Sequence, residues 1–249
     1  MEKLKEEAST LSCRDVATAL SATANLSSPD GLALARALCE AAGPLVVKFD
    51  VRQVAMCFNA LARLGLRDSV FVDFVDKLCR AAVPKMFESN AIDIASIFNA
   101  LAKLGRKDAD LIAALCLVAV PKMKTFEAQA LSNTFNALAK LQVRDARLLS
   151  ALCRVSVPKL RTFLPQHVAL VFNALAKLEY RDDKMVAALR VAAFANVNLF
   201  DAQGLANVVH AIETLDVKDE RLVEALEQRR ARASAQQNRG GRDTMKEKR

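Results

Sequence analysis

The chain has 249 residues, of which 53% are apolar and only 5% are aromatic. Seven Gly and six Pro are too few for an all-β protein of this length, and the many Ala and Leu residues favour closely packed helices. The net charge of +8 does not by itself indicate a polyanionic partner, because the segment from Arg229 onwards carries +6 of it, whereas the preceding body has 28 basic and 26 acidic residues.

A seven-residue motif, FNALAKL, recurs along the chain. It occupies Phe98–Leu104, Phe135–Leu141 and Phe172–Leu178, and Phe58–Leu64 with Arg in place of Lys. Degenerate copies run from 20 to 26 and from 209 to 215. The steps between successive copies are 38, 40, 37, 37 and 37 residues. A fixed period of this size is typical of a structural unit that stacks on its neighbours to complete a shared core.

The period predicts an all-α fold, a right-handed-type α-solenoid of about six helical-hairpin repeats of 37–40 residues. The apolar periodicity continues to about residue 228. We therefore expect a solenoid domain over residues 1–228 and a basic, low-complexity tail over residues 229–249, whose composition is typical of a disordered segment.

In chain order, residues 1–12 predict the start of a short charged helix. Apolar residues at three-and-four spacing over 12–26 predict the second helix of an incomplete first unit. One complete unit begins at Asp108 with a helix that runs towards Pro121, where the missing N–H ends or kinks it. After a loop, a second helix begins near Gln129 and carries the motif.

An Asp stands ten residues after the start of each motif copy, just before an apolar-periodic segment. This placement predicts a helix N-cap. A carboxylate site is less favoured, because no second acid or His accompanies the Asp. The six residues are Asp30, Asp68, Asp108, Asp145, Asp182 and Asp219.

Phe also recurs, once in the motif and once in the loop between the two helices. The loop column is Phe49, Phe87, Phe126, Phe163 and Phe200. Such regular placement predicts core packing rather than stacking on nucleic-acid bases.

Four Cys stand five residues before a Pro, which predicts small buried thiols in a reducing compartment. They are Cys39, Cys79, Cys116 and Cys153. The chain has no CxxC pair and only two His, so neither a zinc site nor a disulfide framework is predicted. A nucleophile with its base, paired acids and a Gly-rich phosphate loop are also missing from the sequence. We therefore expect no catalytic residues, no metal, no cofactor and no enzyme activity.

Basic residues occupy three columns of the repeat, which predicts ribbons of cations suited to a polyanion. The fifth residue after the motif Phe is Arg63, Lys103, Lys140 or Lys177. The ninth is Arg67, Lys107, Arg144 or Arg181, continued by Lys218. Lys85, Lys122 and Lys159 follow the Pro. The alternative is a solvated face whose cations pair with the neighbouring Asp caps.

An amide column follows the motif Phe and consists of Asn59, Asn99, Asn136 and Asn173, continued by His210. An Asn in a helix can offer a donor and an acceptor to a base edge or a ribose. Alternatively, it can hydrogen-bond the loop backbone of the adjacent unit. The tail would add a second, extended RNA contact through Arg229, Arg230, Arg232, Arg239 and Arg242.

The segments PQHVALVFNALAKL and AQALSNTFNALAKL, followed by Arg-Asp and a helix ending in VPK, resemble the octatricopeptide and heptatricopeptide repeats. The resemblance covers roughly residues 13–226. It implies an RNA-binding α-solenoid that acts on transcripts or ribosomal RNA in mitochondria or plastids. The chain lacks the RAP domain of many members, which argues against a nuclease-like role. It also has Asn where the algal consensus has Trp.

We therefore expect a structural component of a mitochondrial ribosome that binds rRNA beside other ribosomal or ribonucleoprotein subunits, with a plastid as the alternative organelle. An armadillo-like protein scaffold and an organellar transcript-stability factor are the competing interpretations. No apolar run is long enough to predict membrane insertion. Because the N-terminus is acidic, a presequence would have been removed or would lie upstream. Basic and Asn columns on one shared concave surface would favour RNA, whereas exposed apolar rows would favour protein.

Overall fold

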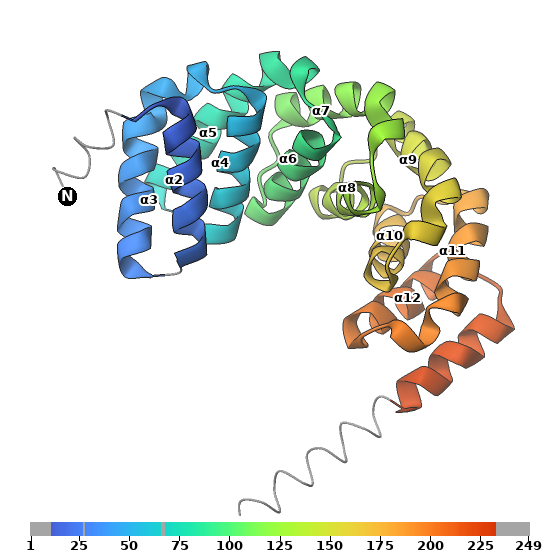
Figure 1. Ribbon diagram of the computed structural model, residues 1–249. Coiled ribbons are helices and arrows are strands. Elements are labelled where there is room, and N and C mark those ends of the chain that lie inside the picture. The colour runs from blue at the N-terminus through green and yellow to red at the C-terminus, as the bar shows by residue number, and fades with distance from the viewer. Residues whose placement is uncertain (1–10, 27, 66–67, 233–249) are drawn as a thin grey trace, which may run out of the picture. The chain divides into compact units, whose positions relative to one another are not determined.

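The computed structural model describes residues 11–26, 28–65 and 68–232, and all regular structure within them is helical. The described residues form two compact units, which divide between Leu148 and Leu149. Within each unit, successive helices pack on their neighbours along the chain (Figure 1). The prediction of an all-α helical solenoid is confirmed.

Each repeat pairs an A helix, which follows the repeated Asp, with a B helix, which carries the motif. The first unit contains α2 (Cys13–Leu26), α3 (Pro29–Ala42), η1 (Gly43–Lys48), α4 (Val51–Leu64), α5 (Ser69–Ala82), η2 (Val83–Glu88), α6 (Ala91–Leu104), α7 (Ala109–Lys122), η3 (Met123–Thr125), α8 (Ala128–Leu141) and the start of α9 (Ala146–Lys159). Even-numbered helices are B helices, and odd-numbered ones are A helices.

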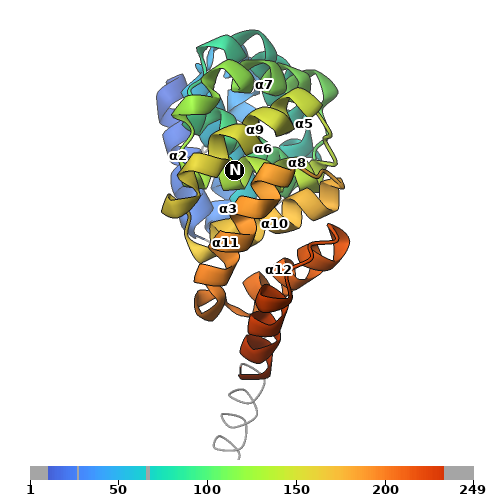
Figure 2. The same cartoon turned by 90° about the vertical axis from the view of Figure 1, so that its right-hand side faces the viewer.

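The second unit begins within α9 at Leu149. It ends in a helix over residues 220–232, which is red in Figure 2. Between them lie η4 (Leu160–Thr162), α10 (Pro165–Leu178), α11 (Asp183–Ala195), η5 (Val197–Leu199) and α12 (Ala202–Thr214). The last helix extends past residue 228, so the first cations of the expected tail lie on a helix.

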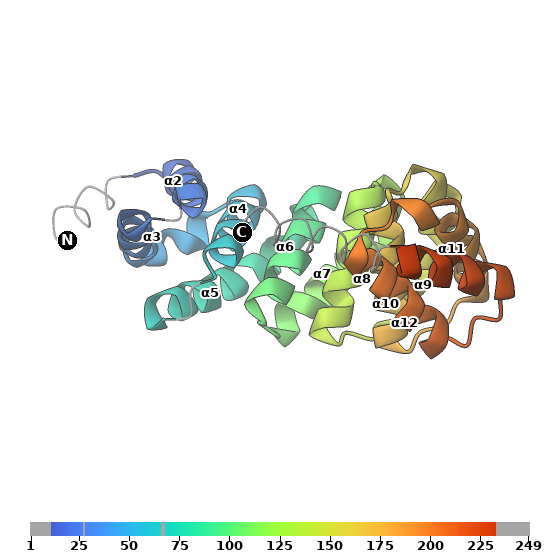
Figure 3. The ribbon, with the colours of Figure 1, turned by 90° about the horizontal axis from the view of Figure 1, so that it is seen from below.

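In the first unit the B helices form one layer and the A helices another (Figures 1 and 3). Helices α2, α4, α6 and α8 pack closely side by side, while α3, α5 and α7 touch one another much less. Because the B helices approach more closely, the first unit curves with its B layer on the inner side.

The motif explains this close approach. Its Phe side chain is completely buried in the four full copies, and the Ala and Leu that follow fill the space between neighbouring helices. The helices α4 and α6 end at Gly65 and Gly105, whose φ angles of 63° and 65° fall in the left-handed region that glycine adopts without strain.

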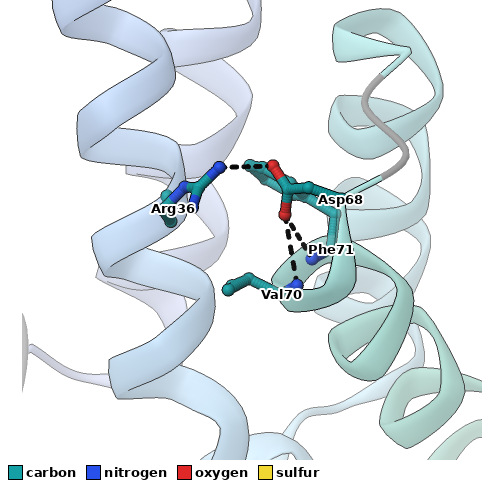
Figure 4. A network of polar contacts seen from close by, with 4 residues as sticks. All are labelled: Arg36, Asp68, Val70 and Phe71. Atoms are coloured by element: carbon teal, nitrogen blue, oxygen red, sulfur yellow. Dashed lines mark hydrogen bonds and ion pairs between the residues drawn. The ribbon is translucent and has the colours of Figure 1, made fainter.

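Asp68 joins two consecutive repeats. Its carboxylate caps α5 by accepting the backbone N–H groups of Val70 at 3.1 Å and Phe71 at 3.4 Å. Arg36 of α3 donates to the other carboxylate oxygen at 2.6 Å (Figure 4). Asp68 therefore starts an A helix and also receives a cation from the preceding one.

The N-cap prediction is confirmed at five of the six Asp positions. Besides Asp68, a backbone N–H three residues ahead donates to Asp108, Asp145, Asp182 and Asp219. The prediction is wrong for Asp30. There the Ser28 side chain accepts the Gly31 N–H at 3.1 Å and Pro29 takes the first helical position, so Asp30 lies in the first turn instead.

The loop Phe column is confirmed at four positions and is wrong at Phe87. Phe49, Phe126, Phe163 and Phe200 are buried. The side chain of Phe87 is 70% exposed, and the buried position five residues after Pro84 belongs to Ser89. Distance from the Pro therefore defines the column.

The predicted burial of the Cys side chains is confirmed at all four repeat positions, and Cys57 is buried as well. Burial raises the pKa of Cys57, Cys79, Cys116 and Cys153 to about 12. These thiols stay protonated at neutral pH and act as small apolar side chains.

Candidate nucleic-acid interface

Each B helix presents a stripe of mostly polar residues at four positions, which lie six and two residues before the motif Phe and one and five residues after it. Their spacing of four, three and four residues places them on one helical face. In α6 the stripe is Ile92, Ser96, Asn99 and Lys103, and in α8 it is Gln129, Asn133, Asn136 and Lys140. We call this set of positions the B-helix stripe.

The stripe brings together two of the predicted columns. The Asn and the Lys are separated by four residues on one helix, so each amide lies one turn from a cation. The structure places Asn59 with Arg63 on α4, Asn99 with Lys103 on α6, Asn136 with Lys140 on α8, and Asn173 with Lys177 on α10.

The cations of this column differ in what they contact. Lys103, Lys140 and Lys177 are exposed and make no ion pair or side-chain hydrogen bond within the described part of the chain. Arg63 is also exposed, but it donates to Asn25 Oδ1 at 2.6 Å and to Ser21 Oγ at 3.0 Å on α2. The three lysines are therefore free to meet an anion, whereas Arg63 also ties α4 to α2.

The Asn side chains lie in the grooves between B helices. Asn59, Asn99 and Asn136 are half-buried and Asn173 is 7% exposed. Among the residues that the structure describes, none of these four amides has a side-chain hydrogen bond. The alternative of an Asn ladder that holds the loop of the next repeat is thus not what the structure shows. His210, in the same position of α12, is exposed, with its Nδ1 3.5 Å from Thr214 Oγ1.

The cations nine residues after the motif Phe lie in the loops that follow the B helices, away from the B-helix stripe. Lys107, Arg144 and Arg181 are exposed. Arg181 Nε donates to Asp183 Oδ1 at 2.8 Å. Its Nη1 donates to the Leu215 carbonyl oxygen, so Arg181 links adjacent repeats. Arg67 falls outside the described residues.

The third basic column is structural. Lys85 donates through Nζ to the carbonyl oxygens of Val47, at 2.7 Å, and Phe49 in the preceding loop. Lys122 does the same one repeat later, to the carbonyl oxygens of Phe87, at 2.7 Å, and Ser89. These half-buried ammonium groups hold consecutive repeats together and are not available to RNA.

Three of the predicted tail cations can be placed. Arg229, Arg230 and Arg232 lie on the helix over residues 220–232. Arg229 donates to the Phe200 carbonyl oxygen at 3.2 Å, whereas the other two are exposed. Arg239 and Arg242 lie outside the described residues.

A hollow of about 390 Å³ opens between α6 and α8 on the stripe side. The amides of Asn99, Gln129 and Asn133 line it together with Ala95 and Ala130. Sequence reasoning missed Gln129 and Asn133, although their positions six and two residues before the motif Phe continue the helical face of the Asn column.

Exposed apolar side chains lie at the turns from A to B helices and also on the A helices, where Leu117 and Val191 are 63% and 73% exposed. In the first unit Val47, Phe87 and Ile92 are 69%, 70% and 73% exposed. In the second unit Phe194 and Leu199 are 52% and 68% exposed near the end of α11. These residues offer contact area to a protein.

Within the residues that the structure describes, no three His, Cys, Asp or Glu side chains gather as metal ligands. None of the helices described is both long and apolar enough to cross a membrane. His167 at the start of α10 is buried, and its Nδ1 accepts the Leu164 N–H at 3.2 Å. Burial lowers the His167 pKa from its usual value of 6.5.

Comparison with known families gives one informative match. The model of a family described as RNA-editing substrate-binding complex 6 protein matches residues 8–239, almost the whole chain. No curated protein matches the chain.

Proposed function

The chain belongs to the RNA-editing substrate-binding complex 6 protein family, and from this premise we propose that it is a non-enzymatic, RNA-binding subunit of a mitochondrial RNA-editing complex. Its partners are then RNA and other proteins of that complex, and it needs no cofactor. The description of the family names an RNA-editing complex, so we place the chain there rather than in a ribosome with rRNA as its ligand.

One observation carries the proposal. The unpaired ammonium groups of Lys103, Lys140 and Lys177 each stand one helical turn from an unbonded Asn amide on the B-helix stripe. In the first unit this face is the inner side of the curve. Cations that need no internal partner can neutralise phosphates, and the half-buried amides of Asn99 and Asn136 can reach ribose hydroxyls or bases, whereas Asn173 is only 7% exposed.

A second role, protein contact, is supported by the exposed apolar side chains of Val47 and Phe87. They lie in the A-to-B turns η1 and η2, so RNA on the B-helix stripe and a protein at the turns do not compete for the same residues. This fits a subunit that holds RNA within a larger complex.

The test compares two triple variants that lose the same charge. K103A/K140A/K177A removes the three stripe lysines, and R80A/R147A/K184A removes three exposed cations of the A helices. Affinity for single-stranded RNA is measured by fluorescence anisotropy over a series of salt concentrations. Each lost phosphate contact lowers the slope of log K against log salt by about 0.7.

We expect the stripe variant to bind RNA weakly, with a slope that is shallower by about 2, since three contacts of about 0.7 each are lost. The A-helix variant should keep most of the wild-type slope. Equal losses in both variants would show a non-specific response to net charge and would contradict the proposed site.

A further inference from the structure

The hollow between α6 and α8 differs in charge from its surroundings. Lys103 and Lys140 stand on the same two helices, one turn beyond Asn99 and Asn136. Among the described residues that line the hollow itself there is no Lys or Arg, and Glu127 is the charged one. A phosphate is repelled by this carboxylate and attracted by the flanking lysines.

The next hollow along the B layer is lined by cations. It is lined by Ser21, Met56, Asn59, Arg63 and Lys103, so two cations face it. The two hollows are neighbours, because α4 and α6 pack side by side, as do α6 and α8. A cationic hollow beside an amide-lined one that has no cation suits a ligand that alternates charged and uncharged parts, as a nucleotide chain does.

The surface of the α6–α8 hollow is suited to a flat, apolar ring with a polar edge. Ala95 and Ala130 provide small side chains, and Ile92, which is 73% exposed, stands at one side. Asn99 and Asn133 supply donors and acceptors that have no partner within the described part of the chain. A volume of about 390 Å³ lies in the range of small-ligand sites, which is roughly 300–1,000 Å³.

We propose that this hollow holds an unstacked nucleobase of single-stranded RNA while Lys103 and Lys140 bind the flanking phosphates. The inference rests on the proposed RNA-binding function and adds the class of RNA. A base in a duplex has its hydrogen-bonding edge paired and its faces stacked, so it cannot enter, whereas a single strand can turn a base into the hollow.

The first experiment changes the RNA. Wild-type protein is titrated with a single-stranded oligonucleotide, with the same strand carrying abasic sites, and with a blunt duplex of equal length. We expect binding of the intact strand to be about tenfold tighter than that of the abasic strand, because the base contacts are lost while the phosphates remain. The duplex should bind more weakly than the intact strand.

The second experiment changes the hollow. A130F fills it, and N99A/N133A removes two amides from its lining. Each variant should weaken binding of the intact strand about tenfold and leave the salt slope unchanged. The affinity for the abasic strand should fall much less, since only contacts to the riboses remain to be lost there. The matched control is A113F, which adds the same ring on the exposed face of α7. Circular dichroism and thermal unfolding verify that each variant folds. If A130F fails to fold, N99A/N133A still tests the hollow.

The outcomes separate the two proposals. No RNA binding by the wild type would overturn the proposed function and the base site together. Lysine-dependent binding with equal affinity for intact and abasic strands, unchanged by A130F and N99A/N133A, would overturn the base site alone. Loss of binding to a protein of the complex in A130F, with RNA affinity intact, would assign the hollow to a peptide and overturn the inference.

Discussion

Arg36 Nη2 lies 2.6 Å from Asp68 Oδ2, so the carboxylate that caps one A helix is held by the A helix before it. The second unit repeats the arrangement with Arg190 and Asp219, whose ion pair measures 2.7 Å. These contacts couple helix initiation to repeat stacking. The cations that make them come from the A helices, which leaves the stripe lysines uninvolved.

Substitution D68A should destabilise the protein by about 1–2 kcal/mol, chiefly through loss of the N-cap. The exposed ion pair adds little, because solvent screens it. D68N keeps an acceptor for the Val70 and Phe71 N–H groups and should cost less than about 1 kcal/mol. Urea unfolding monitored by circular dichroism measures both. Equal losses would show that the ion pair, and not the cap, dominates.

Substitution K122M should cost about 1–3 kcal/mol, because the carbonyl oxygens of Phe87 and Ser89 lose their charged donor. The matched control K184M removes an exposed ammonium on α11 and should change the free energy of unfolding by less than about 0.5 kcal/mol. Thermal and urea unfolding supply the values. If K122M left the free energy of unfolding unchanged, the structural role of the Lys residues that follow the Pro would be contradicted.

The two Phe residues that sequence alone placed in one column should respond differently to truncation. F126A removes a fully buried ring and should cost about 3–5 kcal/mol. F87A removes an exposed one and should change stability by less than about 0.5 kcal/mol. Equilibrium unfolding of both variants measures the two changes in free energy. A large loss of stability in F87A would show that the Phe87 ring is part of the core.

The pH dependence of stability should include a contribution from His167. Because burial lowers its pKa in the folded state, the unfolded state binds more protons in the window just below the usual value of 6.5. The contribution is complete above that value and is lost as pH falls through the lowered pKa. Protonation would also abolish the acceptor for the Leu164 N–H.

Urea unfolding at a series of pH values just below 6.5 measures the contribution of His167 to stability. H167Q retains an acceptor and removes the titration, so its stability should vary less with pH than that of the wild type. An identical pH profile for the two proteins would rule out the His167 contribution.

Much of the fold could be predicted because the motif repeats at a nearly constant step. Its Phe, Ala and Leu fix the B helices and their buried face, and the repeated Asp fixes the start of the A helices. The errors came from matching residue types instead of positions. Phe87 was grouped with Phe126 by type, although it lies three residues after its Pro and Phe126 lies five after.

The candidate site could be predicted only in part. Lys85 and Lys103 are equally regular in sequence, yet one is half-buried against loop carbonyls and the other is exposed. That difference depends on where the preceding repeat places its backbone, which no local pattern records. The hollow between α6 and α8 likewise needs Ala95 and Ala130, from different helices, to come together.

The closer packing of the B helices makes the two layers of the first unit mechanically unequal. Helices α4, α6 and α8 pack closely on one another beneath the hollows of the stripe side, whereas α5 and α7 have few mutual contacts. Bending of the first unit should therefore change the spacing of the A helices more than that of the B helices, which carry Lys103 and Lys140. If these lysines bind RNA as proposed, a strand would meet them at a nearly constant interval.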